Sequence, residues 1–311
     1  MPSQAHNNNT LIVISGPTGI GKSAIAHELA KSLNADIFSA DSRQIYKELQ
    51  IGTASPNASE LKEVNYHFIK HLSIRQSYDV GSYVTDCRAE LNEYFNTYEI
   101  AILVGGTGLY VQSLINGIDQ FPEVSEYAKT EVQNMLKSDG IAGLQSFIQI
   151  HDPQYYSEVD LNNVRRLTRA VEVIITSGSA YSSFKTQPKS NLNWNIIPVL
   201  LNVERQVLYD RINLRVDQMM KDGLWEEAEN LYPYRSFQAL DTVGYKELFA
   251  CMDGQCTKEA AVDRIKQNSR RYAKRQLTWF KKYGDWIELP PDYEAVESLV
   301  SRILKQNPLS K

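Results

Sequence analysis

The segment 11–33 reads LIVISGPTGIGKSAIAHELAKSL, and its middle matches a phosphate-binding loop. The pattern G-x-x-x-x-G-K-[ST] is met at every fixed position by Gly16, Gly21, Lys22 and Ser23. Glycines let several backbone N–H groups point at one anion, and the helix that follows adds the positive end of its dipole. Lys22 supplies a charge for the terminal phosphate, and the Ser23 hydroxyl is a ligand for Mg²⁺. The segment therefore predicts a site for a phosphate chain.

The sequence on both sides of the loop supports this prediction. Residues 11–14 form an unbroken apolar run, which is typical of a buried strand. Ile25, Leu29 and Leu33 recur on one face of a helix. A strand before the loop and a helix after it are the context in which the pattern is specific. Loops of this kind are also typical of nucleotide-binding and ATP-binding proteins.

Composition excludes several classes of protein. The chain has 311 residues, a net charge of −4 and 42% hydrophobic residues, which is typical of a globular protein with a sizeable core. It contains no apolar run of eighteen residues, so we expect no membrane span. Residues 1–10 lack an apolar segment and are predicted to be a disordered tail. Three cysteines without partners at zinc spacing favour free thiols and a cytoplasmic location.

Asp41 directly follows a second apolar strand, which is predicted over residues 37–40. In a parallel sheet, this places its carboxylate in the same crevice as the phosphate loop. The polar residues Ser42, Arg43 and Gln44 come next. An alternative is that Asp41 caps the following helix, and the two roles are compatible.

A third strand, predicted over residues 100–104, runs into Gly105-Gly106-Thr107-Gly108. In phosphate-loop proteins that hydrolyse ATP, the corresponding strand usually ends in an aspartate that helps to hold Mg²⁺. Here the strand instead offers backbone amides and the Thr107 hydroxyl, which allow a substrate to approach closely. The pattern favours a phosphate-bearing substrate beside a single carboxylate over an ATP-driven motor or switch.

The chain is predicted to divide into a core over residues 11–121, a helical insertion over residues 122–195, and a second part of the core over residues 196–311. In the insertion, a helix over residues 162–176 carries Arg165, Arg166 and Arg169. The opposite face carries an apolar stripe of Val164, Leu167, Val171 and Ile174. These arginines are either a nucleic-acid contact or a solvated face.

Two later helices carry further basic residues. A long helix predicted over residues 204–230 contains Arg215, which is placed to neutralise charge on a departing phosphate. A surface salt bridge from Arg215 to Asp217 or Glu204 is the alternative. A helix over residues 257–283 carries a basic stripe with interleaved aromatic residues, which is typical of a nucleic-acid surface. A solvated charged face is again the alternative.

Several motifs together resemble the tRNA dimethylallyltransferase (isopentenyltransferase) family. They are GPTGIGKS (16–23), DSRQIY (41–46), GTASP (52–56), GGTGLY (105–110), NNVRRLTRAVEV (162–173), RVDQMMKDGL (215–224), VGYKE (243–247) and YAKRQLTWF (272–280). The chain departs from the family pattern at Gly19, where alanine is usual, and at Ser55, where lysine is usual. The resemblance implies an α/β fold: a parallel sheet like that of P-loop NTPases, flanked by helices, with an inserted helical subdomain that binds tRNA.

The resemblance also implies the reaction. A dimethylallyl group passes from its pyrophosphate to N6 of the adenosine just 3′ of the anticodon in tRNA. The implied catalytic residues are Asp41 as general base, Arg215 and Thr107, with Mg²⁺ as cofactor on Ser23. The implied pyrophosphate-binding residues are Gly16, Pro17, Thr18, Gly19, Ile20, Gly21, Lys22 and Ser23. The implied contacts to the tRNA anticodon stem-loop are Asp41, Ser42, Arg43, Gln44, Thr107, Arg165, Arg166, Arg169, Lys274, Arg275, Gln276 and Trp279.

Three rival functions remain open at this point. A small-molecule kinase shares the loop and the sheet but has no use for the basic helix. An isopentenyltransferase acting on free adenine nucleotides shares the chemistry but needs no macromolecular surface. A non-catalytic RNA-binding protein would use the loop as a nucleotide switch, but it would not need Asp41 beside that loop. We expect a monomer, because no exposed apolar repeat stands out in the sequence.

Overall fold

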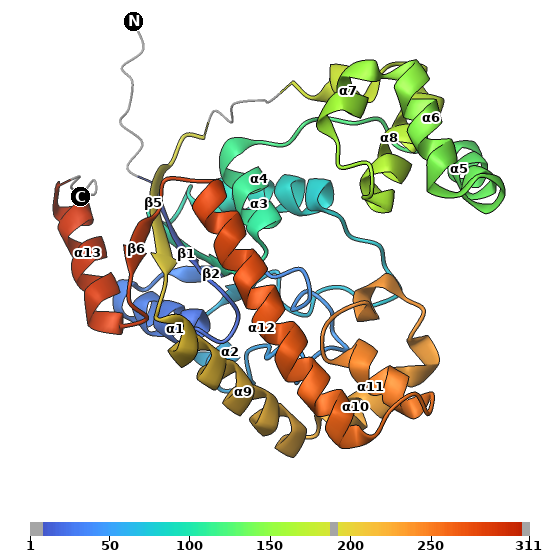
Figure 1. Ribbon diagram of the computed structural model, residues 1–311. Helices are drawn as coiled ribbons and strands as arrows, with labels where there is room; N and C mark the ends of the chain where they lie inside the picture. Colours follow the sequence, from blue (N-terminus) through green and yellow to red (C-terminus); the bar gives the residue numbers. More distant parts are fainter. Residues whose placement is uncertain (1–8, 187–191, 307–311) are drawn as a thin grey trace, which may run out of the picture. The chain divides into compact units, whose positions relative to one another are not determined.

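The computed structural model describes residues 9–186 and 192–306, and the chain forms two compact units (Figure 1). One unit is made of residues 1–115 and 191–311, and the other of residues 116–190. Trp194, which we predicted to lie in the insertion, is buried in the first unit against Phe95, with ring centroids 5.4 Å apart. Thr10 also departs from the prediction, because it is the buried first residue of a strand rather than part of a tail. The rest of that predicted tail, residues 1–8, lies outside the described residues.

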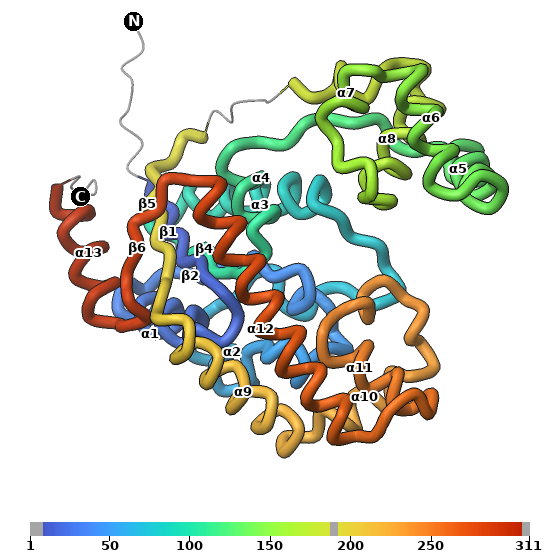
Figure 2. The backbone as a smooth tube through the Cα atoms, in the orientation of Figure 1, coloured from blue at the N-terminus to red at the C-terminus, as the bar shows by residue number. Residues whose placement is uncertain are grey.

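The first unit is organised around a parallel six-stranded sheet in the order β3-β2-β4-β1-β5-β6. Figure 2 traces the backbone through β1, β2, β4, β5 and β6 of this sheet. Its strands are β1 (Thr10–Ser15), β2 (Asp36–Ser39), β3 (Tyr66–His67), β4 (Ile100–Gly105), β5 (Asn195–Leu201) and β6 (Ile287–Leu289). Ser15 pairs with Gly105, and Ser39 pairs with Val104, so β1, β2 and β4 end level with one another. The loops that follow these three strands therefore meet at one edge of the sheet, where ligands bind in open α/β folds.

Helices flank this sheet, as the predicted fold class requires. They are α1 (Lys22–Leu33), α2 (Glu60–Glu63), α3 (Val80–Tyr94), α4 (Gly108–Asn116), α9 (Arg205–Lys221), α10 (Leu224–Leu231), α11 (Tyr245–Met252), α12 (Lys258–Lys282) and α13 (Tyr293–Gln306), with short 3-10 turns at Tyr232–Tyr234 and Gln238–Leu240. One apolar cluster joins β1 to α1, α9 and α13, and includes Ile12, Ile14, Leu29, Ile212 and Val300. Burial of such apolar side chains favours folding of this unit.

One prediction about the helices is wrong. We expected a continuous helix over residues 204–230, but the structure has α9 and α10 with a break between them. Gly223 stands at the break with a φ of +103°, which a right-handed helix cannot contain. The break gives α10 a direction of its own. The basic helix, by contrast, runs unbroken over Lys258–Lys282 and is capped by the Thr257 side chain.

The second unit, residues 116–190, is helical where it is described. It contains α5 (Glu126–Ser138), α6 (Gly140–His151), α7 (Pro153–Glu158), α8 (Val164–Ser177) and a 3-10 turn at Tyr181–Phe184. Leu144, Ile148 and Leu167 form its core with residues from the same helices. Val164, which we assigned to the apolar stripe of α8, is 44% exposed, and Ala170 is buried on that stripe instead. The helix therefore presents a slightly rotated face to the core.

Two expectations drawn from the composition concern the cysteines and possible membrane-spanning helices. Cys87, Cys251 and Cys256 are all free thiols. Among residues 9–186 and 192–306, no helix combines the length and the apolarity that crossing a bilayer requires.

Candidate active site

A cleft of about 880 Å³ lies at the carboxyl edge of the sheet in the first unit. It is lined by residues of the phosphate loop, the segments that follow β2 and β4, and helices α9 and α12. A cavity of this size is within the range that holds small-molecule ligands. Candidates predicted from several separate motifs, among them Lys22, Asp41 and Arg215, are brought together here.

The phosphate loop contributes part of its length to the cleft. Thr18, Gly19, Gly21, Lys22 and Ser23 line it. The other predicted residues of the loop are buried and do not line the cleft; they are Gly16, Pro17 and Ile20. These three residues therefore shape the loop, and we do not expect the side chain of Pro17 or Ile20 to contact a ligand.

Gly19 is required by its surroundings. Its φ is +79°, and a Cβ added there would lie 2.8 Å from Cγ1 of Ile212 on α9. Both features disfavour any other residue at this position. The packing of α9 in this chain therefore suits glycine at position 19, where alanine is usual in the family.

Two cations face Asp41 across the cleft. Burial, and secondarily the charge of Arg215, lowers the pKa of Lys22 to about 7, although the charge of Asp41 acts in the opposite direction. The pKa of Arg215 is also lowered by burial, again opposed by Asp41. The ammonium of Lys22 donates a hydrogen bond to the Pro17 carbonyl at 2.8 Å. The geometry brings a lysine and an arginine close to one carboxylate in a partly buried site, where charges act on an anion more strongly than in bulk water.

The alternative partners of Arg215 are engaged elsewhere. Asp217 forms an ion pair with Lys266 at 2.6 Å. Glu204 caps α9 by accepting a hydrogen bond from the Val207 N–H. The salt bridge that we considered from Arg215 to either residue is therefore not formed, and Arg215 lines the cleft.

Asp41 opens a tight turn rather than a helix. Its Oδ1 accepts hydrogen bonds from the backbone N–H groups of Arg43 at 2.9 Å and Gln44 at 3.4 Å. The cap-like contact that we considered is thus present, although the next helix begins only at Glu60. Asp41, Ser42, Arg43 and Gln44 all line the cleft. The turn fixes the carboxylate beside the phosphate loop.

Thr107 braces this turn from the neighbouring strand. Its hydroxyl oxygen accepts a hydrogen bond from the Ser42 N–H at 3.0 Å, and its own N–H donates to the Ala40 carbonyl at 3.2 Å. The chain packs so closely here that a Cβ on Gly105 would lie 2.1 Å from the Ala40 oxygen. Thr107 therefore holds the residues on both sides of Asp41.

Gln276 has a structural role that the sequence analysis did not predict. It is 7% exposed, and its Oε1 accepts a hydrogen bond from the Thr18 N–H while its Nε2 donates to the Gly106 carbonyl, both at 2.8 Å. Each end of the amide is thus bonded to the protein, although Gln276 still lines the cleft. The side chain ties the phosphate loop to the loop after β4.

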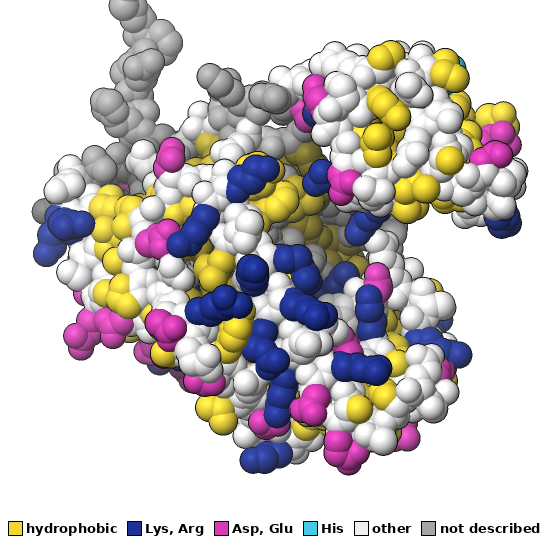
Figure 3. Space-filling model, in the orientation of Figure 1, with side chains coloured by type: hydrophobic (Ala, Val, Ile, Leu, Met, Phe, Trp, Pro, Cys, Tyr) yellow, Lys and Arg dark blue, Asp and Glu magenta, His cyan; other side chains and the backbone are white. Residues whose placement is uncertain are grey.

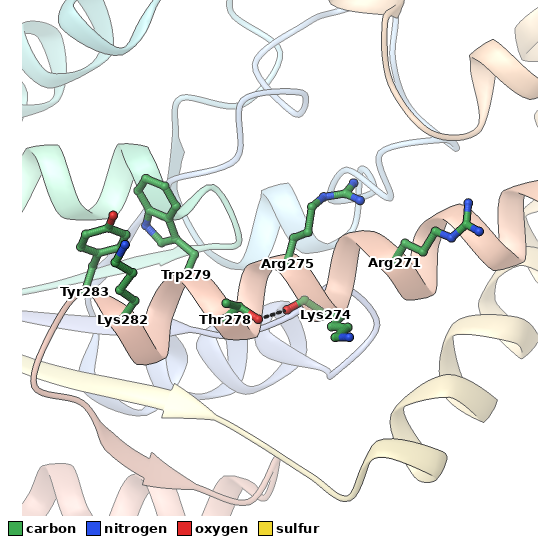
Figure 4. A pocket seen from close by; sticks show the side chains of 7 residues that line it. All are labelled: Arg271, Lys274, Arg275, Thr278, Trp279, Lys282 and Tyr283. Carbon is green, nitrogen blue, oxygen red and sulfur yellow. Dashed lines mark hydrogen bonds between the residues drawn. The ribbon is translucent and has the colours of Figure 1, made fainter. Parts of the chain in front are cut away.

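A second cavity, a groove of about 560 Å³, follows one face of α12 (Figure 4). It is lined by Arg271, Lys274, Arg275, Thr278, Trp279, Lys282 and Tyr283. Lys274, Arg275 and Trp279 are among our candidates for tRNA contacts. Lys and Arg side chains gather over this helix on the surface (Figure 3). The groove thus combines cations with aromatic rings along a single helix.

The remaining tRNA-contact candidates lie in the second unit. Arg165, Arg166 and Arg169 on α8 are all exposed. The guanidinium of Arg169 stands 6.0 Å from the centre of the Phe121 ring. Exposed arginines of this kind are free to reach a phosphate backbone.

Tyr272 was missed by the sequence analysis. It lines the cleft with 37% of its surface exposed, and burial of its hydroxyl together with the charge of Asp41 raises its pKa to about 12. Its position four residues before Gln276, on the same face of α12, was the available signal. An aromatic ring near Asp41 provides a surface on which a base can stack.

The cleft offers oxygen donors for a metal ion, but no acidic cluster is found among the described residues. Within residues 9–186 and 192–306, no group of three or more His, Cys, Asp or Glu side chains is arranged to hold an ion. The Ser23 hydroxyl and the Asp41 carboxylate both line the cleft. These are oxygen donors, which suit Mg²⁺, and Mg²⁺ usually takes one or two protein ligands with water and substrate phosphates.

Comparison with known proteins gives a consistent result. A family model described as IPP transferase matches residues 44–283. The tRNA dimethylallyltransferase of Christiangramia forsetii is 43% identical over 300 residues, covering 94% of this chain and 99% of the relative. The tRNA dimethylallyltransferase of Flavobacterium johnsoniae is 42% identical over 305 residues, covering 96% and 99%.

Solved structures are similar along nearly the whole chain. The full-length tRNA isopentenylpyrophosphate transferase of Bacillus halodurans is 34% identical, with a TM-score of 0.70 and 96% of each chain covered. A eukaryotic dimethylallyltransferase acting on tRNA has a TM-score of 0.82 at 24% identity, covering 97% of this chain and 81% of that one. The second of these shows likeness of fold alone.

Proposed function

This chain belongs to the IPP transferase family, and from that premise we propose that it transfers a dimethylallyl group to tRNA. The donor is dimethylallyl pyrophosphate, the acceptor is N6 of the adenosine 3′ to the anticodon, and pyrophosphate is released. The observation that carries the proposal is the meeting of Lys22, Arg215 and Asp41 in one cleft. A cationic cradle beside a single carboxylate suits an ester that leaves as a diphosphate and a nucleophile that must lose a proton.

The leaving group defines the first requirement. The allylic C1–O bond breaks with carbocation character, so the pyrophosphate gains charge as it departs. Lys22, Arg215 and the N–H groups of the phosphate loop are placed to stabilise that charge. Because Lys22 has a pKa of about 7 in the ligand-free cleft, a bound pyrophosphate favours its protonated form. Binding of the donor thus completes the charge of the cradle.

The acceptor defines the second requirement. The exocyclic amine of adenine is a poor nucleophile and loses a proton as the C–N bond forms. We assign Asp41 as the acceptor of that proton, through Oδ2, which makes neither of the turn's hydrogen bonds. Thr107 acts on this step by holding Ser42, next to Asp41, in place. The base must leave its stack to reach the cleft, at a cost of a few kcal/mol.

Mg²⁺ fits the donors that the cleft offers. We propose that the Ser23 hydroxyl and the donor's phosphate oxygens hold the ion, with water completing its shell. When bound, Mg²⁺ supplies further charge stabilisation for the departing pyrophosphate. The chain's own contribution is to orient the phosphates through residues 18–23.

Two sets of residues are proposed to contact the tRNA. One is the α12 groove, where Lys274, Arg275 and Trp279 combine phosphate contacts with a stacking surface. The other is the exposed arginine set Arg165, Arg166 and Arg169 of the second unit. Ser42, Arg43 and Gln44 line the cleft that the extruded base would enter. We further propose that the protein acts as a monomer.

The decisive experiment is mass spectrometry of nucleosides. Unmodified tRNA is incubated with the protein, Mg²⁺ and dimethylallyl pyrophosphate, then digested. We expect one adenosine to gain the mass of a dimethylallyl group. Parallel reactions with AMP, and with ATP in the absence of tRNA, test the free-nucleotide transferase and the kinase. Transfer to AMP alone, or ATP turnover without any transfer to tRNA, contradicts the proposal.

A further inference from the structure

Glu227 makes an unusual set of contacts outside the residues discussed above. This α10 side chain accepts hydrogen bonds from three consecutive backbone N–H groups, those of Gln50 at 3.1 Å, Ile51 at 2.8 Å and Gly52 at 2.9 Å. It also accepts one from the Tyr245 hydroxyl at 2.6 Å. Successive backbone N–H groups that converge in this way form an anion-binding concavity. Here the anion is the carboxylate of Glu227.

Tyr245 closes this arrangement from α11. The residue is completely buried, and burial, followed by the negative charge of Glu227, raises the pKa of its hydroxyl. The hydroxyl thus remains a neutral donor to the carboxylate. The fit is close, because a Cβ on Gly52 would lie 2.5 Å from the tyrosine oxygen. We call Glu227 and Tyr245 the loop clamp.

The clamped loop in turn holds a residue of the cleft. Nε2 of Gln44 donates to the carbonyls of Thr53 at 3.2 Å and Ala54 at 3.1 Å. Ala54 has a φ of +47°, a conformation that alanine disfavours and that persists only when its surroundings impose it. The orientation of these two carbonyls therefore depends on the contacts that fix the loop.

Gln44 connects the loop to the proposed general base. It ends the turn that Asp41 opens, and its own N–H is one of the two donors to Asp41. Gln44, Gly52, Thr53 and Ala54 all line the cleft. Hydrogen bonds joined by short covalent segments, the 50–54 loop and Gln44 itself, thus connect Glu227 to Asp41. Glu227 itself does not line the cleft.

We propose that Glu227 is a positioning residue for the transfer reaction. Together with Tyr245, it fixes residues 50–54 so that Gln44 and the Asp41 turn face the acceptor base. This inference rests on the proposed function. The carboxylate is suited to the task because hydrogen bonds to a charged acceptor are shorter and stronger than neutral ones.

The test uses the full chain with the substitution E227Q. The amide keeps the size of the side chain, but it replaces one acceptor oxygen with a donor that faces N–H groups. The matched control is E226Q, the exposed neighbour on the same helix. Y245F removes one of the four hydrogen bonds and gives an intermediate variant.

Two readouts separate positioning from a merely structural role. We expect E227Q to lower kcat about tenfold, because a small misplacement of a reacting group slows the chemical step, while KM for dimethylallyl pyrophosphate changes less than about twofold. In hydrogen exchange, the amides of residues 50–52 should exchange at least about tenfold faster. Y245F should show smaller changes of the same kind, and E226Q should match the wild type in both.

The outcomes distinguish this inference from the function on which it rests. Faster exchange at residues 50–52 with an unchanged kcat shows a clamp that does not position the site, and it overturns the proposal. Unchanged exchange overturns it as well. If the wild-type protein transfers nothing to tRNA, the proposed function falls and takes this inference with it. Normal transfer by both wild type and E227Q rejects the inference alone.

Discussion

The cleft and the α12 groove differ in how they are built. The cleft draws on many segments that are far apart in the chain, and it holds some of its polar groups with buried hydrogen bonds, such as those of Gln276. The groove comes from one face of one helix, and its cations are exposed. Charges act strongly in an enclosed site but are screened by salt at an exposed one. Substitutions in the cleft should therefore change chemistry, and those in the groove should change binding in small, salt-dependent steps.

The largest effect is expected at Asp41. D41N keeps the size of the side chain but removes the proton acceptor, so transfer should slow by about 10²–10⁴-fold. Binding of tRNA, measured by filter retention, should change less than about twofold. Full activity of D41N would remove the carboxylate from the mechanism, and the cleft would then no longer differ from the groove in its effect on chemistry.

Lys22 is expected to have the next largest effect, with an opposite effect on stability. K22M removes a charge that stabilises the departing pyrophosphate, and transfer should fall by about 10²–10³-fold. Since folding lowers the pKa of Lys22 from 10.5 to about 7, its burial is unfavourable at and below pH 7. That cost fades as the pH rises toward 10.5, where the unfolded chain also loses the proton.

The matching measurement is thermal unfolding of the ligand-free protein. K22M should unfold about 2–4 °C higher than the wild type at pH 7, and the difference should shrink at pH 10. A lower midpoint for K22M at pH 7 would show that the lysine stabilises the empty cleft, which is the opposite of what its desolvation predicts.

Gln276 links the two regions, because it lies on α12, which forms the groove, and makes hydrogen bonds to two loops of the cleft. Q276A should lower kcat about tenfold and destabilise the protein by about 1–3 kcal/mol, since it leaves the Thr18 N–H and the Gly106 carbonyl without their partner. Chemical denaturation and single-turnover kinetics measure the two effects. Q267A, at an exposed position of the same helix, is the control. A loss of tRNA affinity with normal kcat would instead support the RNA contact that we first predicted.

The smallest effects are expected in the groove. R271A, K274A and K282A should each weaken tRNA binding a few-fold and reduce the slope of log affinity against log salt by up to about one unit. Binding titrations from about 50 to 200 mM salt measure both. K258A, on the same helix but outside the groove, should leave the slope unchanged. A salt-independent affinity in the wild type would count against the groove as an RNA surface.

The part of the site predicted from sequence was encoded in short contiguous motifs. A phosphate loop needs eight adjacent residues, and Asp41 needs only its place at the end of a strand, because parallel strands end at a common edge. The prediction of a continuous helix over residues 204–230 was wrong for a local reason. Gly223 adopts a left-handed conformation that glycine permits but does not require.

The contacts missed by the sequence analysis join distant segments. Gln276 bonds Thr18 from 258 positions away, and Glu227 bonds Gln50 from 177 positions away. No periodicity or spacing reports such pairs, because the hydrogen bonds arise only when packed helices bring those side chains to the loops. Gln276 was therefore assigned to RNA by the basic residues beside it, and Glu227 was not noticed.

The sequence by itself determined the family resemblance, the parallel sheet and the identity of the phosphate-binding and acidic residues. These properties follow from local patterns of apolar, glycine and charged residues. Only the tertiary structure decided which of those side chains face the cleft and which form hydrogen bonds within the protein. It also decided how burial lowers the pKa of Lys22. The reason is physical: orientation and desolvation depend on every neighbour of a side chain, and most of those neighbours are remote along the chain.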